Sequence, residues 1–218
     1  MAFKITVAAL LLLMSASAIP ANAQQATSYN LVELLQKNGL EINTTTQTHV
    51  TDSTKMPAIS TLGIVLLKGV TFESGTIDVD LRGKDVFLKS FLGIAFRAKD
   101  TLNYDVIYFR PFRFHSTDTA TRRWSVQYMA MPGFDYEKLR KEHPLVYENQ
   151  VNPVPDANDW FHATIVVKDD WITVYVNHSA VPSLKIKSLN NNPGKRIALW
   201  TSGIKGDFAN LVISNSTW

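Results

Sequence analysis

The sequence contains no cysteine among its 218 residues. No disulfide bond can hold the fold together, so its stability has to come from an ordinary hydrophobic core. The chain is long enough, and with 45% hydrophobic residues apolar enough, to build such a core. The lack of cysteine also excludes a lipid-attachment cysteine after the apolar segment near the N-terminus.

The sequence also lacks any long block of charge of one sign. Its formal net charge is +3, although the pI is near 9.0. The basic runs at residues 122–123 and 138–141 are short, and acidic residues flank the second. Such runs are typical of solvated surfaces. The sequence therefore predicts no nucleic-acid partner, because that function requires a clustered basic surface.

Motifs for metals and nucleotides are missing as well. The five histidines are scattered and show no H-x-H or H-E-x-x-H spacing, which argues against a zinc site. The sequence has no EF-hand loop, P-loop, dinucleotide fingerprint or G-x-S-x-G elbow. No metal ligand is therefore predicted from motifs.

Long apolar runs are scarce, and the one that exists lies at the N-terminus. Lys4 precedes an apolar run over residues 5–14, and the small residues that follow end in ANA at 21–23. This order is typical of a secretory signal peptide, and the run is too short to span a hydrocarbon layer of about 30 Å. We therefore expect residues 1–23 to be a signal peptide, the protein to be secreted or periplasmic, and the chain to have no transmembrane segment.

The sequence is rich in segments that alternate between apolar and polar residues. In GTIDVDLR, residues 75–82, Ile77, Val79 and Leu81 share one face and charged residues occupy the other. Similar short segments follow, separated by Gly, Asn, Asp and Pro. This pattern predicts an all-β, two-sheet antiparallel jelly-roll sandwich rather than a parallel sheet with helices. We expect a single sandwich domain over residues 24–218, with its core beginning at about residue 40.

Few segments have a helical pattern. Residues 30–38 (NLVELLQKN) are predicted to form a short helix that stops at Gly39, and residues 134–144 (FDYEKLRKEHP) a second. Residues 168–171 (KDDW) are predicted to form a tight hairpin turn between two strands.

The order of these segments resembles the concanavalin A-like lectin/glucanase superfamily, which includes laminin G-like domains and many secreted glycosidases. It is also similar to secreted domains described as 3-keto-disaccharide hydrolases. The resemblance implies a jelly-roll fold and a carbohydrate ligand, and it leaves binding, adhesion and catalysis open. It also implies that calcium is a candidate cofactor, although no calcium motif is present. The segments that carry the resemblance are GTIDVDLRG, GIAFRAKDTLNYDVIYFRP, DWFHATIVVKDDWITVYVN and GKRIALWTSGIKGDFANLVIS.

Two departures from these relatives concern carboxylates. In the hydrolase-like relatives a glutamate typically follows the tyrosine, whereas this sequence has Asp105 after Tyr104. In laminarinase-type glucanases the nucleophile is a glutamate, and Thr76 stands at the matching position. Asp78 and Asp80 share a face of one strand, with a spacing of the order that retaining glycosidases need. A simpler explanation of this pair is that both aspartates lie on the solvent-facing side of an outer strand, where polar residues are usual.

The stretch YDVIYFRPFRF, residues 104–114, alternates like a strand yet carries two arginines and two tyrosines. The preceding strand places the small residues Gly93 and Ala95 on one face, which predicts a hollow. Tyrosine offers an apolar plate and a hydroxyl to a sugar ring, and arginine offers a fork of donors. The residues predicted to line one cleft are Arg97, Tyr108, Arg110 and either Gln127 or Tyr128.

Residues 110–123 are predicted to form a long loop, and long loops in compact domains often carry function. Trp124 after this loop and Trp200 on a later strand are candidate sugar platforms. The alternative to a binding cleft is that these arginines simply extend over an exposed face of the sheet. The sequence does not decide which face of the strands lines the cleft. The complete predicted ligand-binding set is Arg97, Tyr108, Arg110, Arg113, Trp124, Gln127 and Tyr128.

The sequence favours an exported carbohydrate-binding domain without a complete catalytic set. The first alternative is an enzyme that cleaves a di- or oligosaccharide, with Asp105 as the catalytic candidate and Asp135 or Glu137 as its partner. A second alternative is a protein-binding adhesion domain like the laminin G modules. An enzyme predicts two carboxylates that converge in the cleft, one with a raised pKa, and a binder predicts converging aromatic and arginine side chains.

Overall fold

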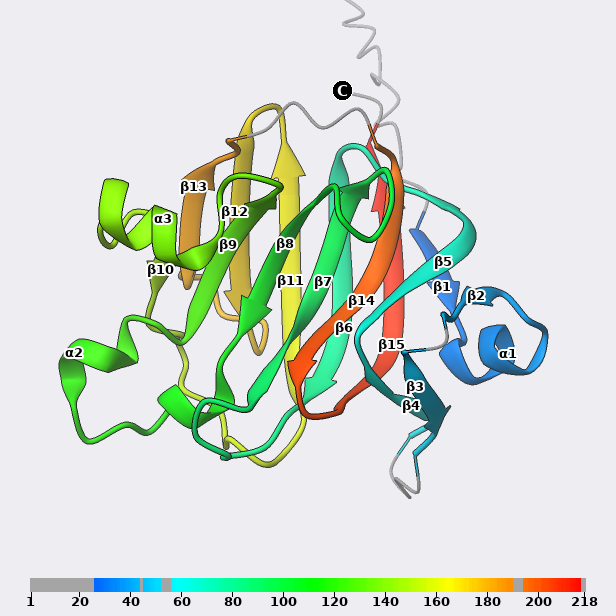
Figure 1. The fold of residues 1–218 in the computed structure, drawn as a ribbon, viewed down its shortest axis with the longest axis horizontal. Coiled ribbons are helices and arrows are strands. Elements are labelled where there is room, and N and C mark those ends of the chain that lie inside the picture. The colour runs from blue at the N-terminus through cyan, green and yellow to red at the C-terminus, as the bar shows by residue number, and fades with distance from the viewer. Residues whose placement is uncertain (1–25, 44, 52–55, 190–193, 217–218) are drawn as a thin grey trace, which may run out of the picture.

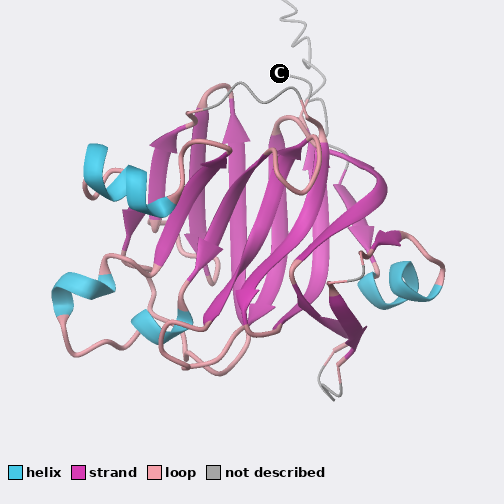
Figure 2. Cartoon of the chain, viewed as in Figure 1, coloured by secondary structure: helices cyan, strands magenta, loops and turns pink. Residues whose placement is uncertain are grey.

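The computed structural model describes residues 26–43, 45–51, 56–189 and 194–216, which form two antiparallel β-sheets packed face to face (Figure 1, Figure 2). The predicted all-β sandwich is confirmed. The predicted signal peptide lies outside the described residues. Within the described ranges, no helix is both long and apolar enough to cross a membrane.

The first layer is an eight-stranded sheet with the order β13-β12-β11-β6-β15-β4-β3, and β1 also pairs with β15. The predicted hairpin is present, because Asp169 and Asp170 form the turn between β11 and β12. The strands of this sheet are β1 Ala26–Tyr29, β3 Gln47–Val50, β4 Ala58–Leu62, β6 Gly75–Arg82, β11 Phe161–Lys168, β12 Trp171–Val176, β13 Leu184–Lys187 and β15 Gly206–Asn215.

The second layer is a seven-stranded sheet with the order β10-β9-β8-β7-β14-β5-β2. Its central strands lie side by side in Figure 1, in front of the eight-stranded sheet. The strands of this sheet are β2 Leu40–Glu41, β5 Ile64–Thr71, β7 Ser90–Ala98, β8 Tyr104–Phe109, β9 Val126–Met131, β10 Glu148–Asn149 and β14 Arg196–Gly203.

The helices are short and lie at the edges of the sandwich. Both predicted helices exist, and the helix after Asn30 ends before Asn38, whose φ of 57° breaks the helix one residue earlier than the predicted stop. The predicted long loop contains one turn of 3-10 helix and a short α-helix. The helical elements are α1 Leu31–Gln36, η1 Pro111–Arg113, α2 Thr119–Arg122 and α3 Tyr136–Glu142.

The core lies between the two sheets and collects their apolar faces. Ile77, Val79 and Leu81 of β6 are fully buried and alternate with half-buried polar residues, as the sequence pattern predicted. From the seven-stranded sheet, Phe109 contacts Phe161 of β11, with ring centroids 5.1 Å apart. The odd-numbered residues at this end of β8 therefore face the core.

Strand β8 is buried along its whole length, on both faces. Its even-numbered residue Tyr108 points away from the other sheet, yet it is only 2% exposed. Side chains from neighbouring strands and from the segments around η1 and α3 cover this outer face. The outer face of the seven-stranded sheet, with these buried polar and aromatic side chains, is therefore the candidate site.

Candidate functional site

One row of residues crosses five neighbouring strands of the seven-stranded sheet. The strand register places Trp200 opposite Gly93, Gly93 opposite Tyr108, Tyr108 opposite Gln127, and Gln127 opposite Glu148. Residues that pair in register project on the same side of a sheet. The row therefore brings an indole, a phenol, an amide and a carboxylate together on the outer face.

Gly93 is the small residue that lets the aromatic members of this row meet. A Cβ at this position would lie 2.0 Å from the carbonyl oxygen of Ile107 and 2.6 Å from Cα of Tyr108. With no side chain between them, Tyr108 and Trp200 contact each other with ring centroids 5.1 Å apart. Gly93 therefore allows the close approach of β8, and the aromatic rings of the two neighbouring strands contact each other beside it.

A pocket of about 460 Å³ opens on this face. The indole N–H of Trp200 donates a hydrogen bond to the hydroxyl of Tyr104 at 3.2 Å, which fixes two of the walls. Mostly apolar walls with a few polar groups are typical of small-ligand sites. The apolar and aromatic lining consists of Leu88, Phe91, Tyr104, Met129, Met131 and Trp200, and the remaining members include Tyr108, Arg110, Asp135, Tyr136 and Arg140.

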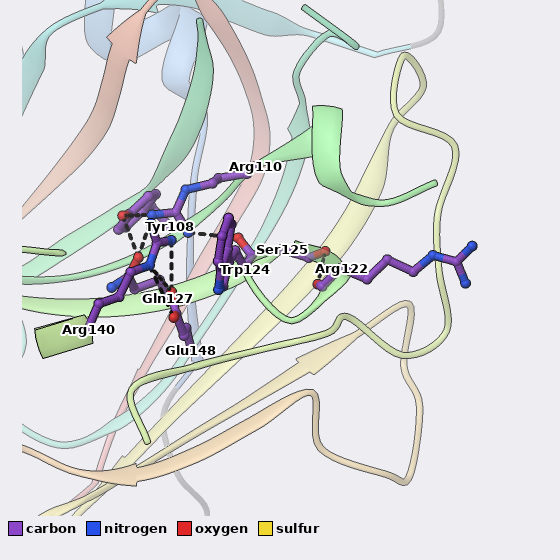
Figure 3. Close-up of polar contacts among 8 residues, drawn as sticks. All are labelled: Tyr108, Arg110, Arg122, Trp124, Ser125, Gln127, Arg140 and Glu148. Atoms are coloured by element: carbon purple, nitrogen blue, oxygen red, sulfur yellow. Dashed lines mark hydrogen bonds and ion pairs between the residues drawn. The ribbon is translucent and has the colours of Figure 1, made fainter. Parts of the chain in front are cut away.

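The deep part of the site is a hydrogen-bonded group around Arg110 (Figure 3). The hydroxyl of Tyr108 donates to Oε1 of Gln127 at 2.8 Å, and Arg110 donates through Nη2 to both of these oxygens. Arg110 also donates through Nη1 to the carbonyl oxygen of Trp124 at 2.7 Å. Burial raises the pKa of Tyr108 to about 12, so its hydroxyl stays a donor at neutral pH.

A second arginine closes the site from α3. Arg140 holds Glu148 through two contacts of 2.9 Å, one from Nε and one from Nη2 to Oε2. Its guanidinium carbon lies 4.3 Å from the ring centroid of Trp124, whose ring also contacts Arg113 at 5.3 Å. Trp124 was predicted to be a sugar platform, but in the structure its indole stacks with two arginines and is absent from the pocket lining.

The predicted position of Arg97 in this cleft is corrected by the structure. Strand β7 has a β-bulge, because it carries one residue more between positions 95 and 98 than the matching stretch of β14. Arg97 sits in the bulge with φ 49°, which interrupts the alternation. Its guanidinium lies 3.6 Å from Asp105 and donates to the carbonyl oxygen of Asp169 in the other sheet. Arg97 therefore points away from the pocket.

Tyr128 and Asp105 also lie on the inner side of the sheet. The hydroxyl of Tyr128 accepts a hydrogen bond at 3.1 Å from the backbone N–H of Leu189, just after β13 of the other sheet. Burial, and next the charge of Asp105, raise the pKa of Tyr128. Of the two residues offered for the cleft on β9, Gln127 is the one that faces outward with Tyr108. Asp105, the catalytic candidate, lies behind the pocket.

The sequence did not point to Arg140 and Glu148 as a pair. They join a short helix to a two-residue strand, and neither element has a pattern that indicates its tertiary partner. Asp135, which was a candidate acid or base, lines the pocket and caps α3 by accepting a hydrogen bond from the backbone N–H of Lys138 at 2.9 Å. Glu137 is not part of the lining and accepts the hydroxyl hydrogen bond of Tyr136.

The carboxylate pair Asp78 and Asp80 lies on the outer face of the eight-stranded sheet, in the other layer of the sandwich. His162 bridges the two, with Nδ1 2.8 Å from Asp80 and Nε2 3.2 Å from Asp78. Burial opposes ionisation, but the hydrogen bonds with His162 lower the pKa of both carboxyls. Across the described ranges, no group of three or more His, Cys, Asp or Glu residues is placed to hold a metal ion.

Sequence comparison gives no relative, since no protein-family model and no curated protein matches the chain. Solved structures share the fold. The carbohydrate binding module CBM66 from Bacillus subtilis has a TM-score of 0.51 at 14% identity, over 81% of this chain and 96% of that one. A Bacillus subtilis protein of unknown function with a galectin-like fold has a TM-score of 0.55 at 10% identity, over 86% and 94%.

A third solved structure is a candidate glycosyl hydrolase from Parabacteroides distasonis. Its TM-score is 0.55 at 14% identity, over 86% of this chain and 99% of that one. At these identities the likeness shows the fold alone, a two-sheet antiparallel β-sandwich as the sequence predicted.

Proposed function

We propose that this chain, a β-sandwich of the concanavalin A-like superfamily, is an exported carbohydrate-binding domain. The observation that carries the proposal is the pocket on the outer face of the seven-stranded sheet, where aromatic walls converge with buried hydrogen-bond donors. Export to the periplasm or the medium rests on the N-terminal sequence pattern. A carbohydrate binding module and a candidate glycosyl hydrolase among the structures of this fold agree with a sugar as ligand.

The chemistry of the pocket suits a sugar ring. Trp200 and Tyr136 offer flat apolar faces to the C–H side of a sugar, and the hydroxyls and guanidinium groups of the site can bond to ring oxygens and hydroxyls. Tyr108, Gln127 and Arg110 hold one another in place before any ligand arrives. Such preorganisation lowers the entropy cost of binding.

Binding is favoured over cleavage by the arrangement of carboxylates. Hydrolysis by the usual mechanism needs two carboxyl groups on either side of the scissile bond, about 5 to 9 Å apart. In the described part of the chain, Asp135 is the one carboxylate in the pocket lining, and it caps α3. Glu148 is 4% exposed and engaged by Arg140, and Asp105 lies on the far side of the sheet. A pocket of about 460 Å³ also favours a small ligand over an adhesion surface.

A comparison of two exposed aromatic residues tests the location of the site. Tyr136 lines the pocket and Trp171 lies on β12 of the other sheet, and each is 43% exposed, so replacing either leaves the core intact. A glycan array identifies the best ligand, and titration calorimetry measures its affinity. Tyr136→Ala should weaken binding about tenfold, as expected for the loss of one aromatic contact. Trp171→Ala should leave it unchanged.

The opposite pattern, loss of binding in Trp171→Ala alone, would move the site to the other sheet. A wild-type chain that binds no glycan on the array would refute the proposed function.

A further inference from the structure

The positive charge around the floor of the pocket exceeds the negative charge. Arg113 and Arg140 lie over the ring of Trp124. Arg110 donates a hydrogen bond to the carbonyl oxygen of Trp124 (Figure 3). Glu148 forms an ion pair with Arg140. Within the described ranges, neither Arg110 nor Arg113 has a carboxylate at ion-pair distance. Within those ranges, Glu148 is the one carboxylate at ion-pair distance from the three guanidinium groups, and Asp135 is the one carboxylate in the pocket lining.

Arg110 is the least expected member of this cluster, because it is only 4% exposed. A buried charge without a counter-charge is costly, and the neutral oxygens that Arg110 bonds to compensate it only in part. Burial is the largest cause that lowers the pKa of Arg110, and the charges of Arg140 and Arg113 also lower it, whereas Tyr108 and Glu148 raise it in part. The site thus holds positive charge in a setting where the folded chain alone does not balance it.

Hydrogen-bond donors are in excess at the same place. Oε1 of Gln127 accepts from Tyr108 and Arg110, which fixes the orientation of the amide. Its Nε2 is buried and makes no hydrogen bond within the described part of the chain, and the same holds for Nε of Arg113. Buried donors normally have partners, so a site with unused donors and unbalanced cations lacks acceptors with negative charge.

We propose that the ligand of this pocket is an acidic carbohydrate, whose carboxylate or sulfate group balances the excess of guanidinium charge at Arg110 and its neighbours. The inference rests on the proposed sugar-binding function and specifies its substrate class. A neutral sugar can satisfy some of the donors but cannot balance the arginines. An anionic group in the pocket gains Coulomb energy in a partly water-excluded site, because Arg110 and Arg140 form part of the lining.

Matched glycans test this preference directly. The array carries each neutral oligosaccharide together with its C6-uronate and its sulfated form. Members of a set share the same sugar rings and linkages, so they differ only in the charged group. We expect the acidic members to bind at least about tenfold tighter, and the two acidic series to show whether a carboxylate or a sulfate is preferred. The affinity of the acidic members should fall between about 0.01 M and about 0.15 M salt, where the Debye length shortens from about 30 Å to about 8 Å.

A pair of variants then probes the charge cluster itself. Glu148→Gln removes the carboxylate that pairs with Arg140, so the ratio of the affinity for acidic ligands to that for their neutral counterparts should rise about fivefold. Arg122→Gln is the control, since the side chain of Arg122 points away from the cluster (Figure 3) and its loss should not alter either series.

Two outcomes separate this inference from the proposed function. If neutral and acidic members bind alike, and Tyr136→Ala weakens both, the sugar site stands and its acidic preference is refuted. The acidic preference is also refuted if Glu148→Gln and salt leave the affinity for acidic members unchanged. If no member of any series binds, both proposals fall.

Discussion

The hydroxyl of Tyr108 donates a hydrogen bond to Oε1 of Gln127 at 2.8 Å, and the two residues face each other across β8 and β9. Arg110 donates to both oxygens, so the two uncharged side chains together accept the hydrogen bonds of the buried Arg110 guanidinium. This contact links the sheet register to the chemistry of the pocket, because only the outward-facing residues of the two strands can form it.

Removing the Tyr108 hydroxyl should therefore destabilise the fold as well as the site. Tyr108→Phe keeps the ring on Trp200 but leaves Arg110 and Gln127 each without one partner. We expect the free energy of unfolding in urea to fall by about 1–3 kcal/mol, the usual cost of buried groups left unpaired. Tyr175→Phe is the control, on a half-buried tyrosine of β12, and should change it by less than about 0.5 kcal/mol. Equal effects in the two variants would contradict the role of Tyr108.

A methyl group at Gly93 should disturb the strand pair beneath the pocket. In Gly93→Ala the new Cβ would meet backbone atoms of Ile107 and Tyr108, which cannot move without shifting β8. We expect a loss of about 2 kcal/mol or more in the free energy of unfolding. The comparison is Gly206→Ala, whose Cβ would meet side-chain atoms at 3.0 Å or more, and which should cost less. A Gly93→Ala chain as stable as the wild type would show that the strands are not this close.

The stability of the fold should fall as the pH rises from neutral to alkaline. Burial opposes a charged imidazolium at His162, but hydrogen bonds to Asp78 and Asp80 outweigh it and raise its pKa from 6.5 to about 9. Because the folded pKa exceeds the unfolded one, the stabilisation is complete below pH 6.5 and disappears as the pH passes through about 9. We expect the free energy of unfolding to drop by about 1–3 kcal/mol across this window.

Urea unfolding of the wild type and of His162→Gln, each at both ends of that window, measures this dependence. The variant lacks the titrating group, so its stability should change less with pH than that of the wild type. Parallel pH profiles in the two proteins would rule out His162 as the cause.

Alternation along the chain was enough to predict most of the fold and part of the site. Side chains of a strand project alternately, so the sequence alone placed Tyr108 and Arg110 on one face and Gln127 and Met129 on one face of β9. The structure joins these two faces into a single surface.

The errors arose where alternation breaks or where the contact is distant in sequence. The bulge at Arg97 inserts one residue into β7, and a one-residue shift moves a side chain to the other face. The pairing of Arg140 with Glu148 depends on how α3 returns to β10, and the sequence carries no periodic signal for that path. Both features depend on tertiary structure, so residue patterns alone did not reveal them.

Replacing Asp105 should separate stability from ligand binding. Asp105 is fully buried between the sheets, 3.6 Å from Arg97, and lies on the opposite side of β8 from the pocket. In Asp105→Asn the Arg97 guanidinium loses its carboxylate, so we expect unfolding in urea to become easier by about 2–4 kcal/mol. Glycan affinity at a temperature where the variant is folded should stay within about twofold, since the pocket lining is unchanged. Loss of binding in a variant of wild-type stability would instead return Asp105 to the functional site.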